Sequence, residues 1–584
     1  MVSRLFTILL VSFSLSPFLS IGQTNWYVDQ ETGDDANSGE SIDEAFASVE
    51  YAVAEHVSPG DTVLIRGVYK NPSYNDGYEF AGDINDPQIW KFENTIKINE
   101  LHGSADAYIT FKSYDNTTII KGDASNIFRV TNSSYLKIIG FEMEGEVNNI
   151  SIETALALQF LYRNAGETES LYRVEPGTTA EEIEEMTFPL LDNVSRPSYT
   201  DTRGLYMSAV HHIEIVDNHI HHTPGTGLRV AECDYIKIIG NELDNNSRRS
   251  YSGTHALVVT KATSFDTEEG YKIFILENEV HHNYNEIFSW APTKTIITPR
   301  IDEGKGISLQ RNQVVSGWTH GRFLVANNVT YWNGFSGVHS NAGTRMDFIN
   351  NTAYFNSYTN TITYEDDPAG NNIGVSTSSG DDIKIINNVI YIDATWGGFP
   401  ISSASTTALT VSNNLVYGVG AELNLDADLD GIETDQTLAN PQFIDTVNFN
   451  FALKESSPAI DIANASVAPV DDFYGQVRDD NPDLGAIEFV IDDASLENRQ
   501  TLTEFKAYPN PFTSEVILNF SSVLPSTYEL LIHDLNGQLM YSENGITNGP
   551  LMLDLSHLSK GVYAVTLLSD KESTGLKTIR LVRK

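Results

Sequence analysis

The 584-residue sequence has little cysteine, little positive charge and few long apolar runs. Cys233 is the only cysteine, so disulfide bonds within the chain are excluded as a source of stability. Asp and Glu number 79 against 36 Lys and Arg, which gives a formal net charge of −43. Nucleic acid and anionic membrane surfaces both require an excess of Lys and Arg, so neither is expected as a partner.

What the sequence does contain is enough apolar surface to build a large core. Hydrophobic residues make up 41% and aromatic residues 10% of the chain, too much for a disordered polyanion. The one long apolar run lies in residues 1–22, where Arg4 precedes it and the small residues Ser20 and Gly22 end it. This pattern predicts a signal peptide rather than a membrane anchor, because the run is short and interrupted. We expect an exported mature chain without a membrane span.

The last residues, 495–584, change character to short alternating strands separated by turn signals. Four landmarks stand out: AYPNPF at 507–512, DLNG at 534–537, LSKGVY at 558–563 and the basic end KTIRLVRK at 577–584. They resemble the C-terminal sorting domain of the type IX secretion system of Bacteroidetes. The resemblance implies a secreted or cell-surface location, with the type IX machinery as a partner. The alternative is a small β-sandwich domain that binds a ligand.

An internal repeat dominates the middle of the chain. A small residue followed by alternating apolar positions recurs, and each copy is followed by an Asn that ends a second apolar strand. The Asn lies 14 residues after the small residue in four copies and 22 residues after it in two. A unit this short cannot bury its apolar face alone and must stack on its neighbours. The copies begin at Gly204, Gly227, Ala256, Gly306, Gly337 and Gly374.

The predicted fold class is therefore all-β: a parallel β-helix over residues 23–494, followed by a small C-terminal β-sandwich. The segments WYV at 26–28 and NPQF at 440–443 resemble the entry and exit of secreted right-handed β-helix proteins. Residues 46–57 are expected to form a helix near the entry, and residues 155–200 an insertion over one end of the groove. Asn pairs are expected to form a structural turn ladder between coils. These pairs are 327–328, 350–351, 387–388 and 413–414.

Strand side chains alternate between the core and the outside, so stacked repeats give outward columns. The first predicted column is Tyr206, Arg229, Val258, Ser308, His339 and Ser376. The second is Ser208, Ala231, Thr260, Gln310, Asn341 and Ser378. A flanking column holds Arg203, Thr226, His255, Lys305, Ser336 and Ile373.

The two longer repeats predict a walled trench that suits a polymer or an oligosaccharide end. Residues 261–270 and 311–321 are expected to form one wall, with Lys261, Arg311, Trp318 and His320 on it. The connection 279–305 is expected to form the opposite wall. It carries His281, His282, Tyr284, Trp290, Lys294, Arg300, Asp302 and Glu303.

Charge is distributed unevenly along the chain. Residues 245–350 hold ten Lys and Arg against nine Asp and Glu, a net +1, which leaves −44 for the remainder. An anionic ligand would be repelled by most of the surface and tolerated in this window. The window therefore predicts an anionic polysaccharide or oligosaccharide substrate.

The stretch EGKGI at 303–307, followed by GRFLVANN at 321–328 and by His339, resembles a pattern of right-handed β-helix proteins related to polysaccharide lyases. The resemblance implies a lyase acting on algal or plant polysaccharides that contain uronate. The sequence departs from the pattern at Lys305 and Gln310, where Asn and Asp are expected. That departure argues against a metal site and makes Lys305 a candidate base.

β-Elimination from a uronate needs a cation for the carboxylate, a base for the proton at C5 and an acid for the leaving oxygen. Arg229 and Arg322 suit the first role, and Lys305, His339 or His255 the second. Tyr206 or a His suits the third, and Glu303 completes the catalytic candidates. The leaving group is a sugar, or water at a free non-reducing end. Substrate contacts are assigned to Lys261, Gln310, Arg311, Trp318, His320, Arg322, Asn341 and Arg345.

Two other functions stay open. A glycoside hydrolase would use two carboxylates, Asp302 with Glu303 or Glu303 with Asp347. A non-catalytic glycan-binding protein or adhesin would show aromatic platforms without a convergent set of Arg, Lys and His.

No cofactor is required by the sequence, and calcium is the one candidate ion. The acidic stretch 426–431 matches half of a calcium loop, but Thr437 stands where a bidentate Glu is needed. Three His doublets also suggest metal, yet adjacent strand residues point to opposite faces, so a doublet cannot chelate one ion without a turn. The doublets are 211–212, 221–222 and 281–282.

Overall fold

The computed structural model describes two compact units, residues 1–489 and 490–584, which are treated separately below. The signal peptide, nearly all of the insertion 155–200 and the calcium-like stretch 426–431 lie outside the described residues. The described residues are 23–70, 94–150, 152, 155, 201–250, 253–287, 301, 303–358, 372–396, 398–421, 423, 435–490, 502–508, 512, 514–522, 528–534, 539–546, 549–569 and 575–583.

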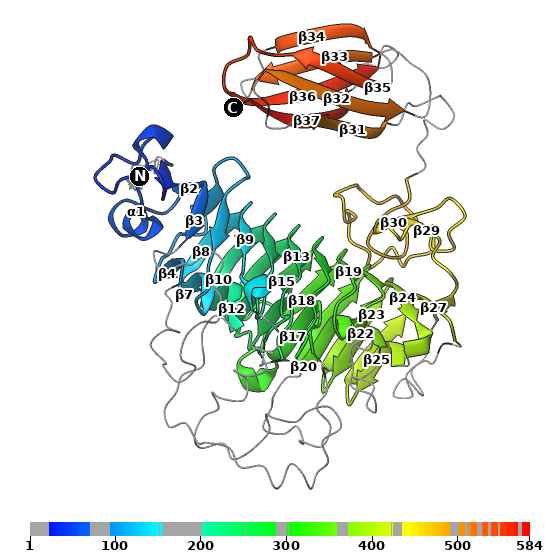
Figure 1. Ribbon diagram of the computed structural model, residues 1–584. Helices are drawn as coiled ribbons and strands as arrows, with labels where there is room; N and C mark the ends of the chain where they lie inside the picture. The colour runs from blue at the N-terminus through cyan, green and yellow to red at the C-terminus, as the bar shows by residue number, and fades with distance from the viewer. Residues whose placement is uncertain are drawn as a thin grey trace, which may run out of the picture. The chain divides into compact units, whose positions relative to one another are not determined.

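The first unit is a stack of parallel coils, and the complete coils place strands on three faces (Figure 1). The first face contains β4 (Ile96–Asn99), β7 (Asn126–Thr131), β14 (Leu257–Thr260), β17 (Ile307–Asn312), β22 (Asn372–Ser378) and β25 (Gly398–Ala404). The second face contains β1 (Asn25–Asp29), β2 (Thr62–Arg66), β5 (Ile109–Ser113), β8 (Ser134–Ile139), β15 (Tyr271–Leu276), β18 (Arg322–Ala326), β23 (Asp381–Ile386) and β26 (Thr407–Ser412).

Three long strands run from the first face onto the second: β10 (Arg203–Val216), β12 (Leu228–Ile239) and β20 (Ser336–Ile349). They turn the corner at residues with left-handed backbone, such as Ala209 with φ 55° and His212 with φ 55° in β10. In the two longer repeats the extra residues sit at this same corner, between β14 and β15 and between β17 and β18. Corner loops therefore vary in length while the strands on either side keep their pairing.

The third face is an all-parallel sheet of short strands. Its members are β3 (Val68–Lys70), β6 (Ile119–Lys121), β9 (Glu142–Glu144), β11 (His219–His221), β13 (Glu242–Asp244), β16 (Glu279–His281), β19 (Val329–Tyr331), β21 (Thr352–Tyr354), β24 (Val389–Asp393), β27 (Leu415–Val419) and β28 (Thr437–Leu438). One continuous apolar core runs inside the coils, because alternate strand residues such as Leu205, Met207 and Val230 all point inward and are fully buried.

The ends of the stack match the predicted entry and exit in position. The helix α1 (Val49–Glu55) begins after Ser48, whose hydroxyl accepts a hydrogen bond from the backbone N–H of Tyr51. At the other end the antiparallel pair β29 (Phe443–Asp445) and β30 (Asn450–Leu453) packs in a second apolar cluster with the third face. Short 3₁₀ turns occur at Ile42–Glu44, Val147–Asn149, Val314–Ser316 and Ala394–Trp396.

A ladder of buried Asn side chains closes the turn between the second and third faces. Asn328 donates from Nδ2 to the carbonyl oxygens of Ile275 at 2.9 Å and Ala326 at 3.1 Å, and to Oδ1 of Asn351 at 2.9 Å. The ladder continues through Asn218, Asn241, Asn278, Asn328, Asn351, Asn388 and Asn414. The predicted structural role of the second Asn of each pair is confirmed.

A second ladder closes the turn from the third face back to the first. Its members are Asn246, Asn283, Asn333 and Asn356. The backbone N–H of Asn246 donates to Oδ1 of Asn283, and each of the next two links runs from Nδ2 of one Asn to Oδ1 of the following one. Each coil is therefore tied to the next by side-chain amides that satisfy backbone carbonyls which would otherwise be buried without a partner.

The second unit contains two antiparallel sheets. One consists of β31 (Leu502–Tyr508), β32 (Glu515–Ser522) and β35 (Gly549–Asp554), and the other of β33 (Tyr528–Asp534), β34 (Leu539–Ile546), β36 (Gly561–Ser569) and β37 (Gly575–Arg583). The prediction of an all-β chain whose first unit is built on parallel sheets is confirmed. The right-handed sense of the coils and the sandwich form of the second unit stay predictions.

Replacing Asn328 by Ala is expected to lower the free energy of unfolding of the first unit by about 2–4 kcal/mol, because several buried polar groups lose their partners. The measurement is the thermal and guanidinium midpoint of the purified chain. Asn448→Ala is the matched control, since Asn448 is exposed and its side chain donates to the nearby Asp445 at 2.7 Å. Equal midpoints for the two variants would contradict a structural role for the ladder.

Candidate functional site

The first face carries the two outward columns in the predicted register. Tyr206 pairs with Arg229, Arg229 with Val258, Val258 with Ser308, Ser308 with His339, and His339 with Ser376. The second column pairs likewise from Ser208 to Ser378. The first column also extends toward the N-terminus through Arg129 and Lys97. These two cations were not predicted, because their coils lack the small residue that marks the later repeats.

A polar cluster forms where the flanking column meets the first column. Lys305 Nζ donates to Oε2 of Glu303 at 2.5 Å, and that oxygen lies 3.6 Å from Nε2 of His255. Nε2 of Gln310 lies 2.7 Å from Nε2 of His255 and 3.2 Å from Oγ of Ser308. We call His255, Glu303, Lys305, Ser308, Gln310 and His339 the Lys305 cluster.

The Lys305 cluster is largely withdrawn from solvent. His255 is 2% exposed, Lys305 6% and His339 8%. The Lys305 ammonium also lies 4.6 Å from the centre of the Phe335 ring, which favours a cation. An ion pair and an imidazole in this low-dielectric setting interact more strongly than they would on an open surface.

His339 is held as a neutral imidazole. Burial lowers its pKa well below the usual value, and the neighbouring Lys305 and His255 lower it further. Nδ1 of His339 lies 2.7 Å from the hydroxyl of Ser376, in the next coil. When Nδ1 carries the proton toward Ser376, Nε2 presents a lone pair, as a general base requires.

His255 is oriented by the backbone. The Lys305 backbone N–H donates to Nδ1 of His255 at 3.3 Å, so in the neutral ring the proton resides on Nε2. Nε2 is the atom that faces Glu303 and Gln310. With the proton on Nε2, the Gln310 amide must turn its Oε1 toward the ring, because an amide NH2 group cannot accept a hydrogen bond. In that arrangement His255 is a proton donor in the cluster.

Arg229 belongs to a separate basic strip on the N-terminal side of the same column. Burial lowers the pKa of its guanidinium, and the nearby Arg203 lowers it further. Arg203 lies 5.3 Å from the Tyr206 ring and 3.8 Å from an Asp201 carboxylate oxygen. Within the described part of the chain, no carboxylate forms an ion pair with Arg229. The strip of Lys97, Arg129, Arg203 and Arg229 thus offers a site for anionic groups.

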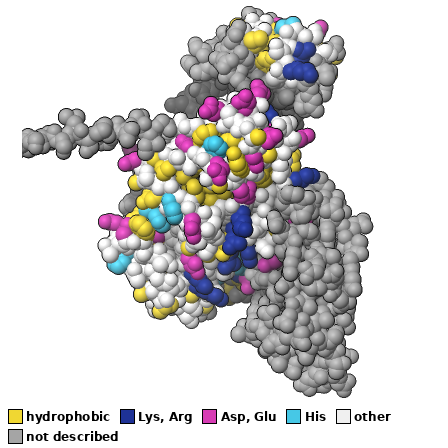
Figure 2. Space-filling view, turned by 90° about the vertical axis from the view of Figure 1, so that its left-hand side faces the viewer, with side chains coloured by type: hydrophobic (Ala, Val, Ile, Leu, Met, Phe, Trp, Pro, Cys, Tyr) yellow, Lys and Arg dark blue, Asp and Glu magenta, His cyan; other side chains and the backbone are white. Residues whose placement is uncertain are grey.

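The molecular surface shows charge of one sign collecting locally. On the face displayed in Figure 2, Lys and Arg side chains gather in a compact group, whereas Asp and Glu side chains are spread over the described surface.

Trp318 does not line the trench as predicted. It is fully buried, with its ring centre 5.0 Å from that of Phe323, and it belongs to the core of the stack. Arg345 supports the same loop, because its guanidinium donates to the carbonyl oxygens of Gly321 at 2.8 Å and Trp318 at 2.7 Å. The wall is thus anchored by Trp318 and Arg345.

Arg322 lies on the second face and not beside Arg229. It pairs with Asp347 at 2.5 Å and with Asp382 at 2.7 Å, and these carboxylates raise the pKa of its guanidinium. Arg322 therefore does not join the Lys305 cluster on the first face, and its predicted role in binding a substrate carboxylate stays a prediction. Asp347 is held by Arg322 and by the Tyr271 hydroxyl at 2.5 Å, so it does not pair with Glu303 as the hydrolase hypothesis required.

The remaining predicted contact residues lie at the corner between the first and second faces. Lys261, Arg311 and Asn341 are exposed, and the Lys261 backbone N–H donates to the carbonyl of Gln310 at 3.1 Å. Ser264 binds the backbone of Gly317 and His320, so the two loops form one wall as predicted. His320 is half-buried and lies 3.8 Å from Glu269.

The predicted opposite wall is only partly within the described residues. Trp290, Lys294, Arg300 and Asp302 lie outside them. His281 belongs to the third face. A cavity of about 480 Å³ opens beside the turn that follows, lined in part by His282, Tyr284, Trp332, Tyr358 and Phe449.

The two rings of each His doublet were expected to point to opposite faces, but a turn in the backbone within each doublet brings them together. The second His of each doublet has left-handed backbone, with φ 55°, 53° and 53° at His212, His222 and His282. The two Nδ1 atoms consequently lie 2.7–2.8 Å apart in each doublet. Burial, then His281, lowers the pKa of His282 to about 4, so the His282 ring is neutral near pH 7.

The charge window 245–350 does not act as one patch. Arg248 pairs with Glu286, and the buried Lys272 pairs with Asp234 at 3.1 Å. The window samples three faces of the stack in turn, so its net charge averages unrelated surfaces. The basic strip, by contrast, lies entirely outside the window.

Comparisons with known proteins bear on the second unit. A family model described as the secretion system C-terminal sorting domain matches residues 506–580. Residues 506–580 are thus similar to a secretion sorting domain. The chain is therefore exported, to a secreted or cell-surface location. Among the described residues, no helix has the length and apolar character needed to cross a membrane.

For the first unit the comparisons are weak. No curated protein matches the sequence. A GH136 lacto-N-biosidase from Eubacterium ramulus aligns at 12% identity over 71% of this chain and 67% of its own, with a TM-score of 0.37. A rhamnogalacturonan lyase aligns at 14% identity over 81% of this chain and 98% of its own, with a TM-score of 0.31. The A-module of a mannuronan C-5 epimerase from Azotobacter vinelandii aligns at 14% identity over 68% of this chain and 91% of its own, with a TM-score of 0.32. At these scores the likeness supports no conclusion about chemistry.

Trp318→Ala is expected to lower the stability of the first unit by about 3–5 kcal/mol, because it empties a large buried volume. The thermal midpoint measures this loss. Lys261→Ala, in the facing loop, is the control and is expected to leave the midpoint unchanged, since Lys261 is exposed. An unchanged thermal midpoint in Trp318→Ala would contradict its burial in the core and support the prediction that Trp318 lines the trench.

Proposed function

We propose that the first unit is a carbohydrate-active lyase that performs β-elimination on polysaccharides or oligosaccharides containing uronate. The observation that carries this proposal is the buried imidazole of His339, which lies beside the Lys305 ammonium and has its Nδ1 2.7 Å from the Ser376 hydroxyl. Elimination needs an unprotonated base to remove the proton at C5, and it needs a cation to stabilise the negative charge that develops when that proton leaves. His339 and Lys305 supply these two groups side by side.

In the proposed reaction, Nε2 of His339 takes the proton from C5 of the uronate. The electrons of that C–H bond form the C4–C5 double bond, and the C4–O bond breaks. The leaving oxygen takes a proton from Nε2 of His255. The products are an unsaturated uronate and either a shortened sugar chain or water.

Lys305 is better suited to neutralise the substrate carboxylate than to act as the base. Its ammonium is already paired with Glu303, at 2.5 Å, and lies in the coil next to His339. Glu303 also lies near His255, so it can hold both groups in place. Gln310, bonded to Ser308 and beside His255, completes the support.

Arg229 and Tyr206 are better placed for other sugars of the same chain. Adjacent coils are about 4.8 Å apart, so Arg229 lies about 14 Å and Tyr206 about 19 Å from His339 along the stack. Three and four coil steps separate them from His339. The basic strip would therefore hold neighbouring carboxylates while elimination takes place in the Lys305 cluster.

The first test incubates the purified chain with uronate-containing oligosaccharides and follows ultraviolet absorbance of the new double bond. Absorbance must rise if elimination occurs. New reducing ends without absorbance would instead indicate hydrolysis, and binding without either product would indicate a glycan-binding protein.

His339→Ala and Lys305→Ala are each expected to reduce kcat by at least about 100-fold, the usual effect of removing a general base or its electrostatic partner. Circular dichroism and the thermal midpoint must show that the variants stay folded. Arg229→Ala is the informative comparison, because loss of a remote carboxylate contact raises KM and leaves kcat nearly unchanged. Full activity of both cluster variants would remove the Lys305 cluster from the reaction.

The pH profile gives an independent test of His339. Because its pKa is lowered, the imidazole stays unprotonated as the pH falls through 6.5, and kcat/KM is retained there. Activity is lost only at lower pH, when Nε2 takes a proton. An acid limb centred at or above pH 6.5 in the wild-type kcat/KM profile would contradict the assignment.

A further inference from the structure

The third face contains a cluster that the elimination reaction does not use. His219 and His221 point outward from β11, and Glu242 and Asp244 point outward from β13 in the next coil. His219 pairs in register with Glu242, and His221 with Asp244. Two residues separated by one position on a strand share a face, so the four side chains form a two-by-two grid.

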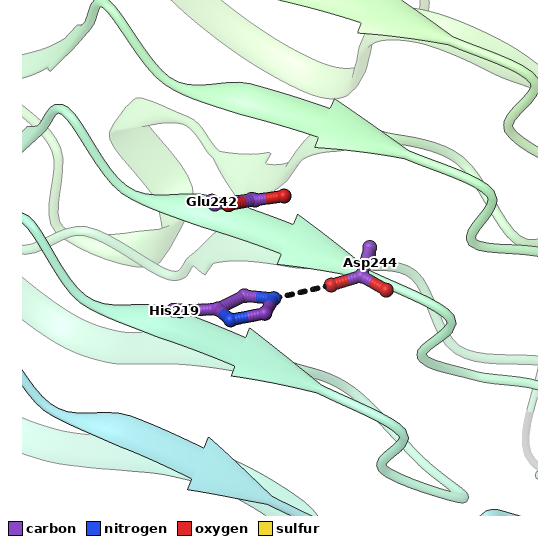
Figure 3. Close-up of side chains that lie close together, drawn as sticks. All are labelled: His219, Glu242 and Asp244. Atoms are coloured by element: carbon purple, nitrogen blue, oxygen red, sulfur yellow. Dashed lines mark hydrogen bonds and ion pairs between the residues drawn. The ribbon is translucent and has the colours of Figure 1, made fainter. Parts of the chain in front are cut away.

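Three members of this grid converge on one point. Nε2 of His219 lies 2.6 Å from Oδ1 of Asp244, and one ligand atom from each of His219, Glu242 and Asp244 lies within 4.8 Å of the others (Figure 3). The Asp244 side chain is 11% exposed and the His219 side chain 39%. The group thus combines the nearly buried carboxylate of Asp244 with the His219 imidazole and the Glu242 carboxylate, which are both open to solvent.

Neighbouring residues orient the ligand atoms. Nδ2 of Asn245 donates to Oδ2 of Asp244 at 2.6 Å, which leaves Oδ1 directed at His219. Nε2 of His281, in the following coil, lies 3.2 Å from Oε1 of Glu242. Outer contacts of this kind fix the orientation of metal-binding side chains.

The surrounding charge is unbalanced. On the four strands β9, β11, β13 and β16 the outward positions hold five carboxylates and three His, with no Lys or Arg. Lys121, in the preceding coil, is paired with Glu144 at 2.8 Å. A divalent cation would offset this charge where protein cations do not.

We propose that His219, Glu242 and Asp244 bind a divalent first-row transition metal, with zinc as the best probe. Imidazole nitrogen favours such metals over calcium and magnesium, which prefer oxygen ligands throughout. Three protein ligands leave a fourth position of a tetrahedral ion open to solvent. The proposal is independent of the lyase reaction, since the Lys305 cluster lies on the first face.

The grid needs only small side-chain movements to accept zinc. Metal–ligand bonds of about 2.0–2.2 Å place tetrahedral ligand atoms about 3.3–3.6 Å apart. The His219–Asp244 pair must open slightly from its hydrogen-bonded distance, and the Glu242 carboxylate must move inward. Glu242 can do so readily, because its side chain is 47% exposed.

The test is titration calorimetry of the full chain, produced without a polyhistidine tag and freed of metal by chelation, with zinc chloride. One site per chain is expected, and His219→Ala, Asp244→Asn and Glu242→Gln are each expected to weaken it at least tenfold. Glu242→Gln changes an exposed side chain, so a folding defect cannot explain its effect. His320→Ala is the matched control, because it removes a half-exposed His that lies near a carboxylate elsewhere.

Cobalt provides the spectroscopic readout. Bound in this grid it must give the intense visible absorption of a four-coordinate ion, and the band must disappear in His219→Ala. Zinc binding that is absent, or that the three variants leave unchanged, would overturn the proposal. So would calcium binding tighter than zinc.

Discussion

The in-register stacking of parallel coils is the constraint on which the rest of the structure depends. Each strand of a face is hydrogen-bonded to the same position of the next coil, so a side chain has a fixed neighbour about 4.8 Å away along the stack. The two Asn ladders hold this register at the turns, where no strand pairing exists. The Lys305 cluster, the basic strip and the His219 grid are all consequences of that alignment, since their members come from different coils.

Much of this alignment could be predicted from sequence because the repeat has a period and strands alternate. The small residues at 204 and 227 were sufficient to place Tyr206 beside Arg229. Those at 306 and 337 placed Ser308 beside His339 in the same way. Corners could not be predicted in the same way. Trp318 sits in a loop without periodicity, and its burial depends on how that loop packs on Phe323 and Arg345.

Charge along a solenoid has to be counted by face. Arg322 and Arg229 belong to the same kind of repeat, yet one is neutralised by two carboxylates on the second face and the other stands in a basic column on the first. The His-x-His pattern at residues 219–221 shows the same lesson. Its partners Glu242 and Asp244 follow 23 residues later, a spacing that becomes meaningful only once the coil length is known.

At the corner between the first and second faces the connecting segment varies in length, whereas the strands on either side keep the same pairing. In β10, β12 and β20 the chain passes this corner without leaving the strand, whereas ten residues, 261–270, cross it between β14 and β15. Pairing on both sides is the same in either case. The corner thus accepts loops of different length. The height and the side chains of the trench wall can therefore change while the strand pairing of the coils stays the same.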